Sequence, residues 1–448
     1  MQRREIAGIG IGKILTGVII ASLVIGAAVY YLFYTGRFGG GSKLKLTSSA
    51  RVGYEYSHLA ADNNIVSDYL FSRSKNLIVQ KGGDGILAAS SYTIAGRLVT
   101  QEATSSGVFG LSDQALLLKC YVRAGDRSNA SALVKEVINR FRLPDGCYKA
   151  YVYSDEALSN EEMILTSASM DWLDALMDYY ISYGNNDDYH EIKRMTEILF
   201  DEQGRLRPEQ ISVAGYAESL YVGLEATGDY EEESSLEQLY GTLTGEMDSA
   251  DTQRNEIAEN VTGVLLSNIN LRMIKDLENN GLIAQGAYET AVKAVKDGLA
   301  GSGYFYYAYS TAGEMDCGDY IYTGQHTGSI DISQHIKTMK NLAEAGELDN
   351  ESFAAFKEQI MNSGRIYSEY VILTGNFSGG EAQGAYSDGL MLAYYMGDRD
   401  LYSMLSDTLG RRVATKSTSP ALYMIFREEN DRYVFYAREN FAARLATS

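Results

Sequence analysis

Two segments of the chain place carboxylates at the start of an apolar helix. Residues 381–402, EAQGAYSDGLMLAYYMGDRDLY, carry Glu381 and Asp388 among small and aromatic residues, and residues 102–127, EATSSGVFGLSDQALLLKCYVRAGDR, carry Glu102 and Asp113 in the same way. Burying a carboxylate without a partner costs several kcal/mol, so the repeated arrangement indicates a use for these acids. One protonated and one ionised carboxyl group are what glycoside hydrolysis requires.

Carboxylates and aromatic side chains recur at the starts of other apolar segments. These are Asp171, Trp172 and Asp174 in TSASMDWLDAL, Tyr216 and Glu218 in GYAESLY, Glu259 in AENVTG, Asp331 in GSIDISQH, and Tyr386 beside Asp388. Carboxylates accept hydrogen bonds from sugar hydroxyls, and aromatic faces stack on sugar rings. Any single acid there also stabilises a helix N-terminus by about 0.3–1 kcal/mol, so the hypothesis of a site rests on their recurrence.

The acids divide into two expected roles. For the proton donor we expect Glu381 or Glu102, and for the base Asp171, Asp331 or Asp388. A separation of roughly 6.5–9.5 Å between acid and base would give inversion, and about 5 Å would give retention. The second role is sugar binding, which we expect of Asp113, Trp172, Asp174, Glu218, Tyr386 and Tyr216.

The hydrophobic period predicts the helices that position these residues. From residue 105 onward an apolar helix is followed six times by a break and then by a helix with one apolar face. The apolar helices are expected near 107–123, 166–183, 211–227, 260–279, 329–345 and 384–396, and their partners near 128–142, 187–200, 231–244, 284–300, 350–363 and 398–410. Apolar inner helices covered by one-faced outer helices predict an all-α fold, an (α/α)6 toroid of six helical hairpins. An open helical solenoid is the alternative.

Short Tyr-rich segments bounded by Gly separate several of the hairpins, at 143–153, 302–314, 364–375 and 421–439. They predict short β-hairpins on one rim of the toroid. Residues 52–100 are expected to add one or two helices or a lead-in strand. In a closed ring, one end of every inner helix faces a single concave mouth, so acids that are far apart in sequence would converge there.

The N-terminus carries a membrane signal. Residues 14–35, ILTGVIIASLVIGAAVYYLFYT, hold no charge and are long enough to cross a bilayer. Arg3, Arg4 and Lys13 precede them, which predicts that residues 1–13 stay in the cytoplasm. We therefore expect a signal-anchor helix, a flexible linker over 36–50, and one extracytoplasmic domain over 51–448 at the cell membrane. A cleaved signal peptide is the alternative.

Composition excludes several classes of protein. The net charge of −20 argues against a nucleic-acid partner. It also disfavours acidic polymers as substrates and favours a cationic amino-sugar polymer. Three cysteines (Cys120, Cys147 and Cys317) and four scattered histidines fit no metal-ligand spacing, so we expect no metal and no cofactor. The cysteines are expected to be small buried hydrophobes, although one pair could form a disulfide outside the cell.

Residues 95–185 resemble a known family. GRLVTQEATSSGVFGLSDQALLLKCYVRAGDR, then LPDGCYKAYVYS, then TSASMDWLDALMDYYISYG are similar in order to the motifs of the family-8 glycoside hydrolases, which are (α/α)6 toroid endoglucanases. The resemblance implies a polysaccharide hydrolase, and it extends to enzymes attached to bacterial cellulose and exopolysaccharide secretion. EAQGAYSDGLMLA, at 381–393, also looks like a variant of the family's acid motif, displaced to the sixth inner helix.

This chain departs from the family where the catalytic Glu is expected. Ser106 follows Thr104 and Ser105 there, and a hydroxyl cannot serve as a proton donor at neutral pH. Either another carboxylate has the role or the site is inactive. The leading hypothesis is a membrane-anchored glycosidase acting on cell-surface or secreted polysaccharide. The alternatives are an inactive toroid that binds a glycan and assists export or a synthase complex, and a polysaccharide lyase or uronyl hydrolase, for which a basic cleft would be evidence.

Overall fold

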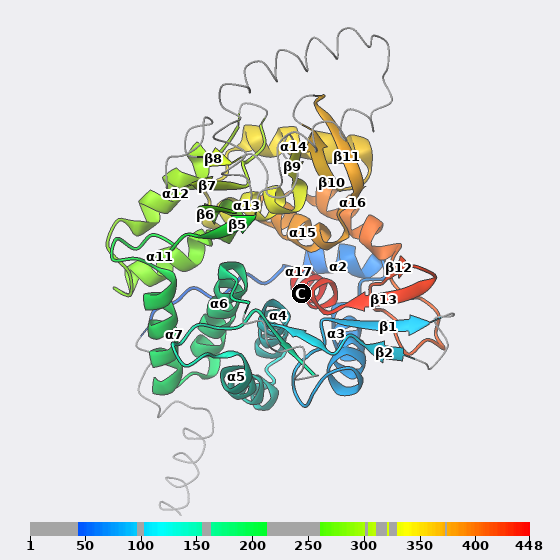
Figure 1. The fold of residues 1–448 in the computed structure, drawn as a ribbon. Coiled ribbons are helices and arrows are strands. Elements are labelled where there is room, and N and C mark those ends of the chain that lie inside the picture. Colours follow the sequence, from blue (N-terminus) through cyan, green and yellow to red (C-terminus); the bar gives the residue numbers. More distant parts are fainter. Residues whose placement is uncertain are drawn as a thin grey trace, which may run out of the picture.

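A computed structural model describes residues 44–95, 103–154, 163–212, 260–300, 303–310, 320–321, 329–371 and 374–448. The described chain is mainly helical and forms a ring of inner helices, seen along its axis in Figure 1. In ring order these are α4 (Leu111–Arg123), α6 (Thr166–Tyr183), α11 (Leu271–Asn279), α13 (Ile332–Ala345), α15 (Tyr386–Tyr395) and α17 (Ala437–Ala446). α11, α13, α15, α17, α4 and α6 pack on one another in that order, and α6 contacts the turn that precedes α11 and forms an ion pair with α11 through Asp174 and Arg272. The ring is therefore closed, which rules out an open solenoid.

Outer helices cover the ring from outside. They are α5 (Arg127–Phe141), α7 (Asn186–Leu199), α12 (Ala287–Asp297), α14 (Asn350–Ser363) and α16 (Arg399–Gly410), joined on the N-terminal side by α2 (Tyr54–Asp62), α3 (Ser67–Ser74) and the π-helix η1 (Lys75–Lys81). Several outer helices start at a side-chain cap, as where Asp126 accepts from the backbone of Asn129 and Asp398 from that of Leu401. Five of the six predicted outer helices match these bounds within three residues.

One of the six predicted hairpins is not tested by the structure. The helices expected at 211–227 and 231–244 lie almost wholly outside the described residues, and the described start of that segment belongs to strand β5 (Glu209–Ser212). The last inner helix is α17, which packs on α3 from the other end of the chain. Arg444 of α17 pairs with Asp68 of α3 at 3.0 Å, 376 residues away. The ring is thus completed by its two ends.

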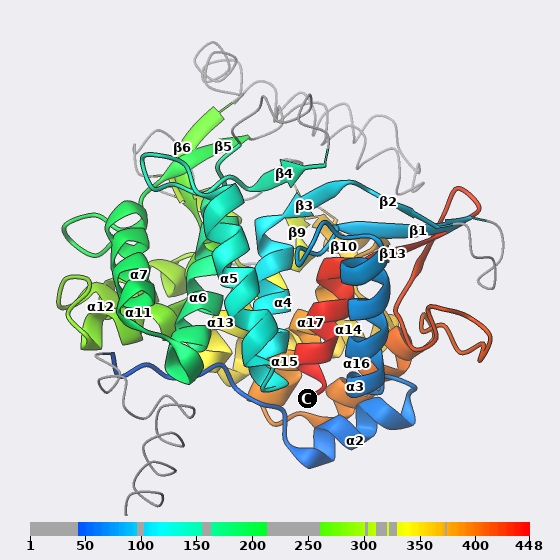
Figure 2. The same cartoon turned by 90° about the horizontal axis from the view of Figure 1, so that it is seen from below.

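Short strands gather at the end of the ring where the inner helices begin, as Figure 2 shows. Four antiparallel sheets contain β12-β13-β1-β2, β11-β10-β9, β3-β4 and β5-β6-β7-β8. Their bounds are β1 (Ser91–Ala95), β2 (Ala103–Ser105), β3 (Val108–Gly110), β4 (Tyr151–Tyr153), β6 (Asn260–Leu265), β7 (Ala308–Ser310), β8 (Tyr320–Ile321), β9 (Ser329–Asp331), β10 (Tyr367–Val371), β11 (Asn376–Glu381), β12 (Arg427–Glu429) and β13 (Arg432–Tyr436). The predicted rim of β-hairpins is present.

These strands explain why several inner helices start later than predicted. The helix expected at 260–279 begins only at Leu271, because residues 260–265 are strand and 266–268 form the 3-10 turn η3 (Leu266–Asn268). Asn270 caps the true start by accepting from the backbone of Met273 at 3.1 Å. A second 3-10 turn, η4 (Gln383–Ala385), precedes α15. A three-residue strand that leads into an apolar helix is too short to show an alternation of apolar and polar residues, so the sequence pattern assigns it to the helix.

Residues 44–52 cross the other end of the ring as an extended strap (Figure 2). Thr47 donates to Asp276 of α11 from its backbone N at 2.7 Å, and Ser49 donates to Asp178 of α6 from its backbone N at 3.0 Å. Arg123 of α4 donates to the carbonyls of Ala50 at 2.7 Å and Ser448 at 2.8 Å. The strap therefore ties three inner helices together at the end opposite the strands.

The strap gives a first testable prediction. We expect Arg123→Leu to lower the free energy of unfolding by about 2–3 kcal/mol. Each hydrogen bond from a charged donor is worth about 1.5–3 kcal/mol, and water can partly replace the donor that the carbonyls of Ala50, Leu445 and Ser448 lose, because these contacts are only partly buried. Denaturant unfolding measures this loss. The matched control is Arg399→Leu, whose side chain is 56% exposed and pairs with Glu55 only at 3.9 Å. A loss for Arg123→Leu no larger than for this control would mean that the strap does not stabilise the ring.

Among the described residues no helix is long and apolar enough to span a bilayer. The predicted membrane segment, residues 14–35, lies outside the described part of the chain.

Candidate active site

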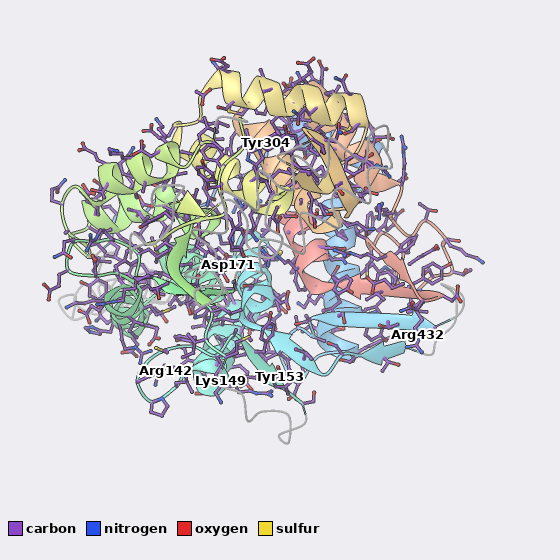
Figure 3. The ribbon with its side chains drawn as sticks, turned by 45° about the horizontal axis from the view of Figure 1, so that its top comes forward. Arg142, Lys149, Tyr153, Asp171, Tyr304 and Arg432 are labelled. Atoms are coloured by element: carbon purple, nitrogen blue, oxygen red, sulfur yellow. The ribbon has the colours of Figure 1, made fainter. Side chains whose placement is uncertain are left out.

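A cavity runs along the axis of the ring, with an empty volume of about 1130 Å³ that is partly open to solvent. Its walls come from every inner helix. Near the strand-bearing mouth they carry Asp171 of α6, Lys337 and Lys340 of α13, Asp388 of α15 and Arg438 of α17. In Figure 3, Asp171 is labelled near the middle of the ring, with Tyr304 and Tyr153 on opposite sides of it. The structure thus brings residues from positions 171 to 438 into one concave site.

Asp113 of α4 does not line the cavity, and only 8% of its surface is exposed, but it lies close enough to Asp171 and Arg438 at the mouth for their charges to act on it. Ser90 donates a hydrogen bond to its carboxyl group through Oγ at 2.5 Å. Burial raises the pKa of Asp113 to about 6, although Ser90, Arg438 and the backbone of Gly110 act in the opposite direction. Asp171 also interacts with it and raises the pKa further. This carboxyl group is therefore half protonated near pH 6.

The two acids that line the mouth are held by lysines of α13. Asp171 pairs with Lys337 at 3.6 Å and Asp388 pairs with Lys340 at 2.6 Å. Burial alone would raise the pKa of Asp388, but the Lys340 ammonium more than offsets this effect and holds that pKa below its usual value. Asp388 is thus an acceptor rather than a proton donor.

A second polar layer lies deeper in the ring, toward the strap. Asp174 of α6 forms ion pairs with Lys119 of α4 and Arg272 of α11, and Arg272 also pairs with Glu344 of α13 at 3.1 Å. Burial would raise the pKa of Asp174, but the two cations hold it well below its usual range. Asp174 was expected to bind sugar, and although it borders the cavity, its oxygens are occupied by protein cations.

Three residues expected in the site lie elsewhere. Glu381, at the end of β11, pairs with Arg412, which follows the outer helix α16, and accepts a hydrogen bond from Tyr386 at 2.5 Å. Glu381 does not line the axial cavity of the described residues. Tyr386 and Trp172 are both 0% exposed, so they pack in the core and have no face to offer a sugar. We therefore leave all three out of the proposed site.

Asp331 stands at the mouth as the N-cap of α13, where it accepts from the backbone of Gln334 at 3.1 Å. It faces Glu369 in the pairing of β9 with β10, and both Asp331 and Glu209 act on Tyr307. Burial, followed by these two acids, raises the pKa of Tyr307 to about 12. Glu209 and Glu369 were missed in the sequence because strands this short hide their alternation.

Three candidates, Glu102, Tyr216 and Glu218, lie outside the described residues, as does Glu259. Ser106 is described and exposed, and its hydroxyl lies 3.4 Å from the carbonyl of Val108. Position 106 therefore carries no carboxylate, although the family resemblance predicts a Glu there. Asp113 is the described acid closest to it on the same helix entrance, inside the first turn of α4.

The expectation of an acidic cleft is not met. Around the described cavity, four carboxylates (Asp171, Asp174, Glu344 and Asp388) face six cations (Lys119, Arg123, Arg272, Lys337, Lys340 and Arg438). Elsewhere in the described chain, no group of three His, Cys, Asp or Glu residues could hold a metal ion. The chain as a whole is acidic, but the described residues around this cavity include more cations than carboxylates.

Comparisons with known proteins support the fold. No family model and no curated protein sequence matches the chain. Among solved structures, a novel α-amylase from Clostridium perfringens superposes with a TM-score of 0.60 at 14% identity, covering 84% of this chain and 97% of that one. A β-1,3-1,4-glucanase from Paenibacillus sp. X4 gives a TM-score of 0.50 at 11% identity, over 92% and 97%. A reducing-end-xylose-releasing exo-oligoxylanase mutant gives 0.50 at 9% identity, over 89% and 97%.

The chain therefore has a family-8-like (α/α)6 toroid fold. That fold was expected from the motifs between residues 95 and 185, and the match extends over most of the chain. At these identities the likeness concerns the fold alone, so the chemistry must be argued from the site.

Proposed function

We propose that this protein is a glycoside hydrolase that cleaves a polysaccharide bound across the strand-bearing mouth of the ring. The observation that carries the proposal is that Asp113 and Asp171 interact through their charges but have unlike environments. Asp113 is buried and has a pKa of about 6, whereas Asp171 borders open cavity and faces a lysine at 3.6 Å. A pair of carboxyl groups whose environments differ in this way is the arrangement that acid–base cleavage of a glycosidic bond uses.

The two residues would have separate roles. Asp113 would donate its proton to the leaving oxygen of the glycosidic bond, and Asp171 would take a proton from water as it attacks, or would attack the sugar itself. Lys337 would orient the Asp171 carboxylate through their ion pair. Asp331, the N-cap of α13 at the strand-bearing end of the ring, is the remaining candidate for the base.

The test is turnover on a panel of polysaccharides: β-glucans, xylan, chitosan, and polymers that contain uronic acids. We expect Asp171→Asn to reduce kcat by about 10²–10⁴-fold, the usual contribution of a general acid or base. We also expect kcat/KM to fall as the pH rises through about 6, because Asp113 loses its proton there. Asp407→Asn, on the exposed face of α16, is the control. Full activity in Asp171→Asn would exclude the proposed role.

A second candidate is a toroid that binds a glycan without cleaving it. Two observations favour it: the exposed Ser106 at the family's acid position, and the cations that hold the acids lining the cavity. Binding of a polysaccharide with no products released from any member of the panel would support this reading.

We further propose that the enzyme is held at the cell membrane by residues 14–35, with its ring outside the cytoplasm. The strap supports this orientation, because residues 44–52 cross the end of the ring opposite the mouth. A short linker before the strap would then hold the mouth away from the bilayer, toward secreted polysaccharide or a synthase or export complex. Protease accessibility of the ring domain in intact cells tests the orientation.

A further inference from the structure

Arg438 differs from every other cation around the axial cavity. It is the second residue of α17 and reaches the mouth between α15 and α4. Protein surrounds it, yet its side chain stays exposed to the cavity. Asp113, Asp171 and Asp388 act on it from a distance. Among the described residues, however, no carboxylate lies within ion-pair distance of its guanidinium, and no hydrogen bond to it is formed.

The other cavity cations are already engaged. Lys340 holds Asp388 at 2.6 Å, Arg272 holds Asp174 and Glu344, and Lys119 holds Asp174. Arg123 donates to three backbone carbonyls. The remaining cation, Lys337, has one ion pair at 3.6 Å, longer than a hydrogen bond. Arg438, with no ion pair among the described residues, and Lys337, with only a long one, are thus the two least engaged cations at the mouth.

These two cations repel each other across the mouth. Burial lowers the pKa of Lys337, and Arg438 lowers it further, while Asp171 acts in the opposite direction. An anion placed between them would remove the repulsion and accept their free N–H groups. A guanidinium presents its donors as a planar fork that fits a carboxylate through two parallel hydrogen bonds.

We propose that Arg438 and Lys337 form a subsite for a carboxylate carried by the sugar chain, so that the substrate is an acidic, uronic-acid-containing polysaccharide. This inference rests on the proposed function, since it names the substrate class for the same mouth. It reverses the expectation drawn from the net charge of the chain, because the subsite is cationic although the protein as a whole carries −20. Neutral polysaccharides would leave both cations unsatisfied.

The test compares uronic-acid oligosaccharides from glucuronan, polygalacturonate and alginate with the same oligosaccharides after reduction of their carboxyl groups to hydroxymethyl groups. Binding to the full-length protein is measured by calorimetry, and cleavage by product analysis. We expect at least one acidic chain to bind at least 10-fold more tightly than its reduced counterpart, and we expect added salt to weaken its binding.

Variants then assign the effect. We expect Arg438→Gln to weaken binding of the acidic chain by about 10–50-fold and to change binding of the reduced chain by less than twofold. Arg438→Lys keeps the positive charge but loses the planar fork of N–H donors. We expect its affinity for the acidic chain to lie between those of the parent and Arg438→Gln. Arg432→Gln is the matched control, because Arg432 lies exposed at the outer edge of the molecule (Figure 3). Asp171, Asp388 and Asp113 attract the Arg438 guanidinium, so thermal unfolding must show that Arg438→Gln is folded at the temperature of the binding assay.

The outcomes separate the two proposals. If a reduced chain binds and is cleaved as well as its acidic parent, the carboxylate subsite is excluded and the proposed hydrolase stands. If acidic chains bind but Arg438→Gln binds them equally well, the subsite is again excluded. If no polysaccharide, acidic or neutral, is bound or cleaved, both proposals fail.

Discussion

Replacing Asp113 with Asn should abolish most turnover and, at the same time, make the protein more stable above pH 6. Asn cannot donate a proton to a leaving oxygen, so we expect kcat to fall by about 10²–10⁴-fold. Its amide oxygen can still accept from Ser90, as the carboxyl group does, so the local packing should survive. A gain in stability together with a loss of activity marks a residue kept for chemistry rather than for folding.

The stability gain depends on pH in a defined direction. The pKa of Asp113 is about 6 in the folded protein against 3.8 for an unperturbed Asp. Between these values the folded state holds a proton that the unfolded chain has released, so stability falls as the pH rises from about 4 to about 6. The full cost, about 3 kcal/mol for two pH units, is present above pH 6. We therefore expect Asp113→Asn to be more stable than the parent by up to that amount at pH 7.5, and to have almost the same stability as the parent at pH 4.

Urea unfolding of the parent and of Asp113→Asn at both pH values measures the difference. Asp113→Ala is the companion variant, because it removes the carboxyl group and also the acceptor for Ser90. We expect it to lose turnover like Asp113→Asn but to gain less stability. Equal stability of the parent and Asp113→Asn at both pH values would show that the carboxyl group is not perturbed, and an active Asp113→Asn would exclude it as the proton donor.

The largest loss of stability is expected from Asp174→Ala. This change leaves Lys119 and Arg272 in the ring without the carboxylate that both of them contact. Their side chains are only 15% and 8% exposed, so water cannot replace it fully. Removing one partner from a buried ion pair typically costs about 3–5 kcal/mol, because an uncompensated charge remains. Lys119 keeps Asp178 at 3.7 Å and Arg272 keeps Glu344 at 3.1 Å, so we expect a loss toward the lower end of that range, measured by denaturant unfolding at pH 7.

Asp407→Ala is the matched control, since it breaks an Asp–Arg pair whose side chains are 50% and 73% exposed. Exposed pairs contribute about 0–1 kcal/mol, so this variant should be close to the parent. If Asp174→Ala lost no more stability than Asp407→Ala, the deeper polar layer would not stabilise the ring.

Most of the ring could be predicted from the sequence because its helices obey a simple periodicity. Inner helices such as α6 are apolar nearly all round and outer helices such as α7 on one face, and both patterns are local. The convergence of Asp171, Asp174 and Asp388 on one cavity followed from that topology. α17 was missed because ARENFAARLA, residues 437–446, mixes charged and apolar residues and directly follows a strand.

The partners of the acids could not be predicted in the same way. Glu381 is occupied by Arg412, 31 residues further along the chain, and no local pattern announces that pair. The lysines at the mouth did leave a signal, since Lys337, Lys340 and Glu344 are the charged residues of α13 and recur at helical spacing. Charged residues at such spacing on one face of an inner helix are expected to face the cavity. An analysis that included the cations as well as the acids would have predicted lysines in the site.

The ring closes only when α17 packs on α3, so the protein cannot reach its native fold before α17 has been made. Residues 68 and 444 meet across 376 positions of sequence, and contacts this distant slow folding because a very long loop must close first. Before residues 437–446 are synthesised, α4 and α15 lack the neighbour that covers their flanks. The emerging chain therefore exposes apolar surface until residues 437–446 have been made, a state prone to aggregation. Assembly of this protein should accordingly depend on chaperones that protect a ring that still lacks α17.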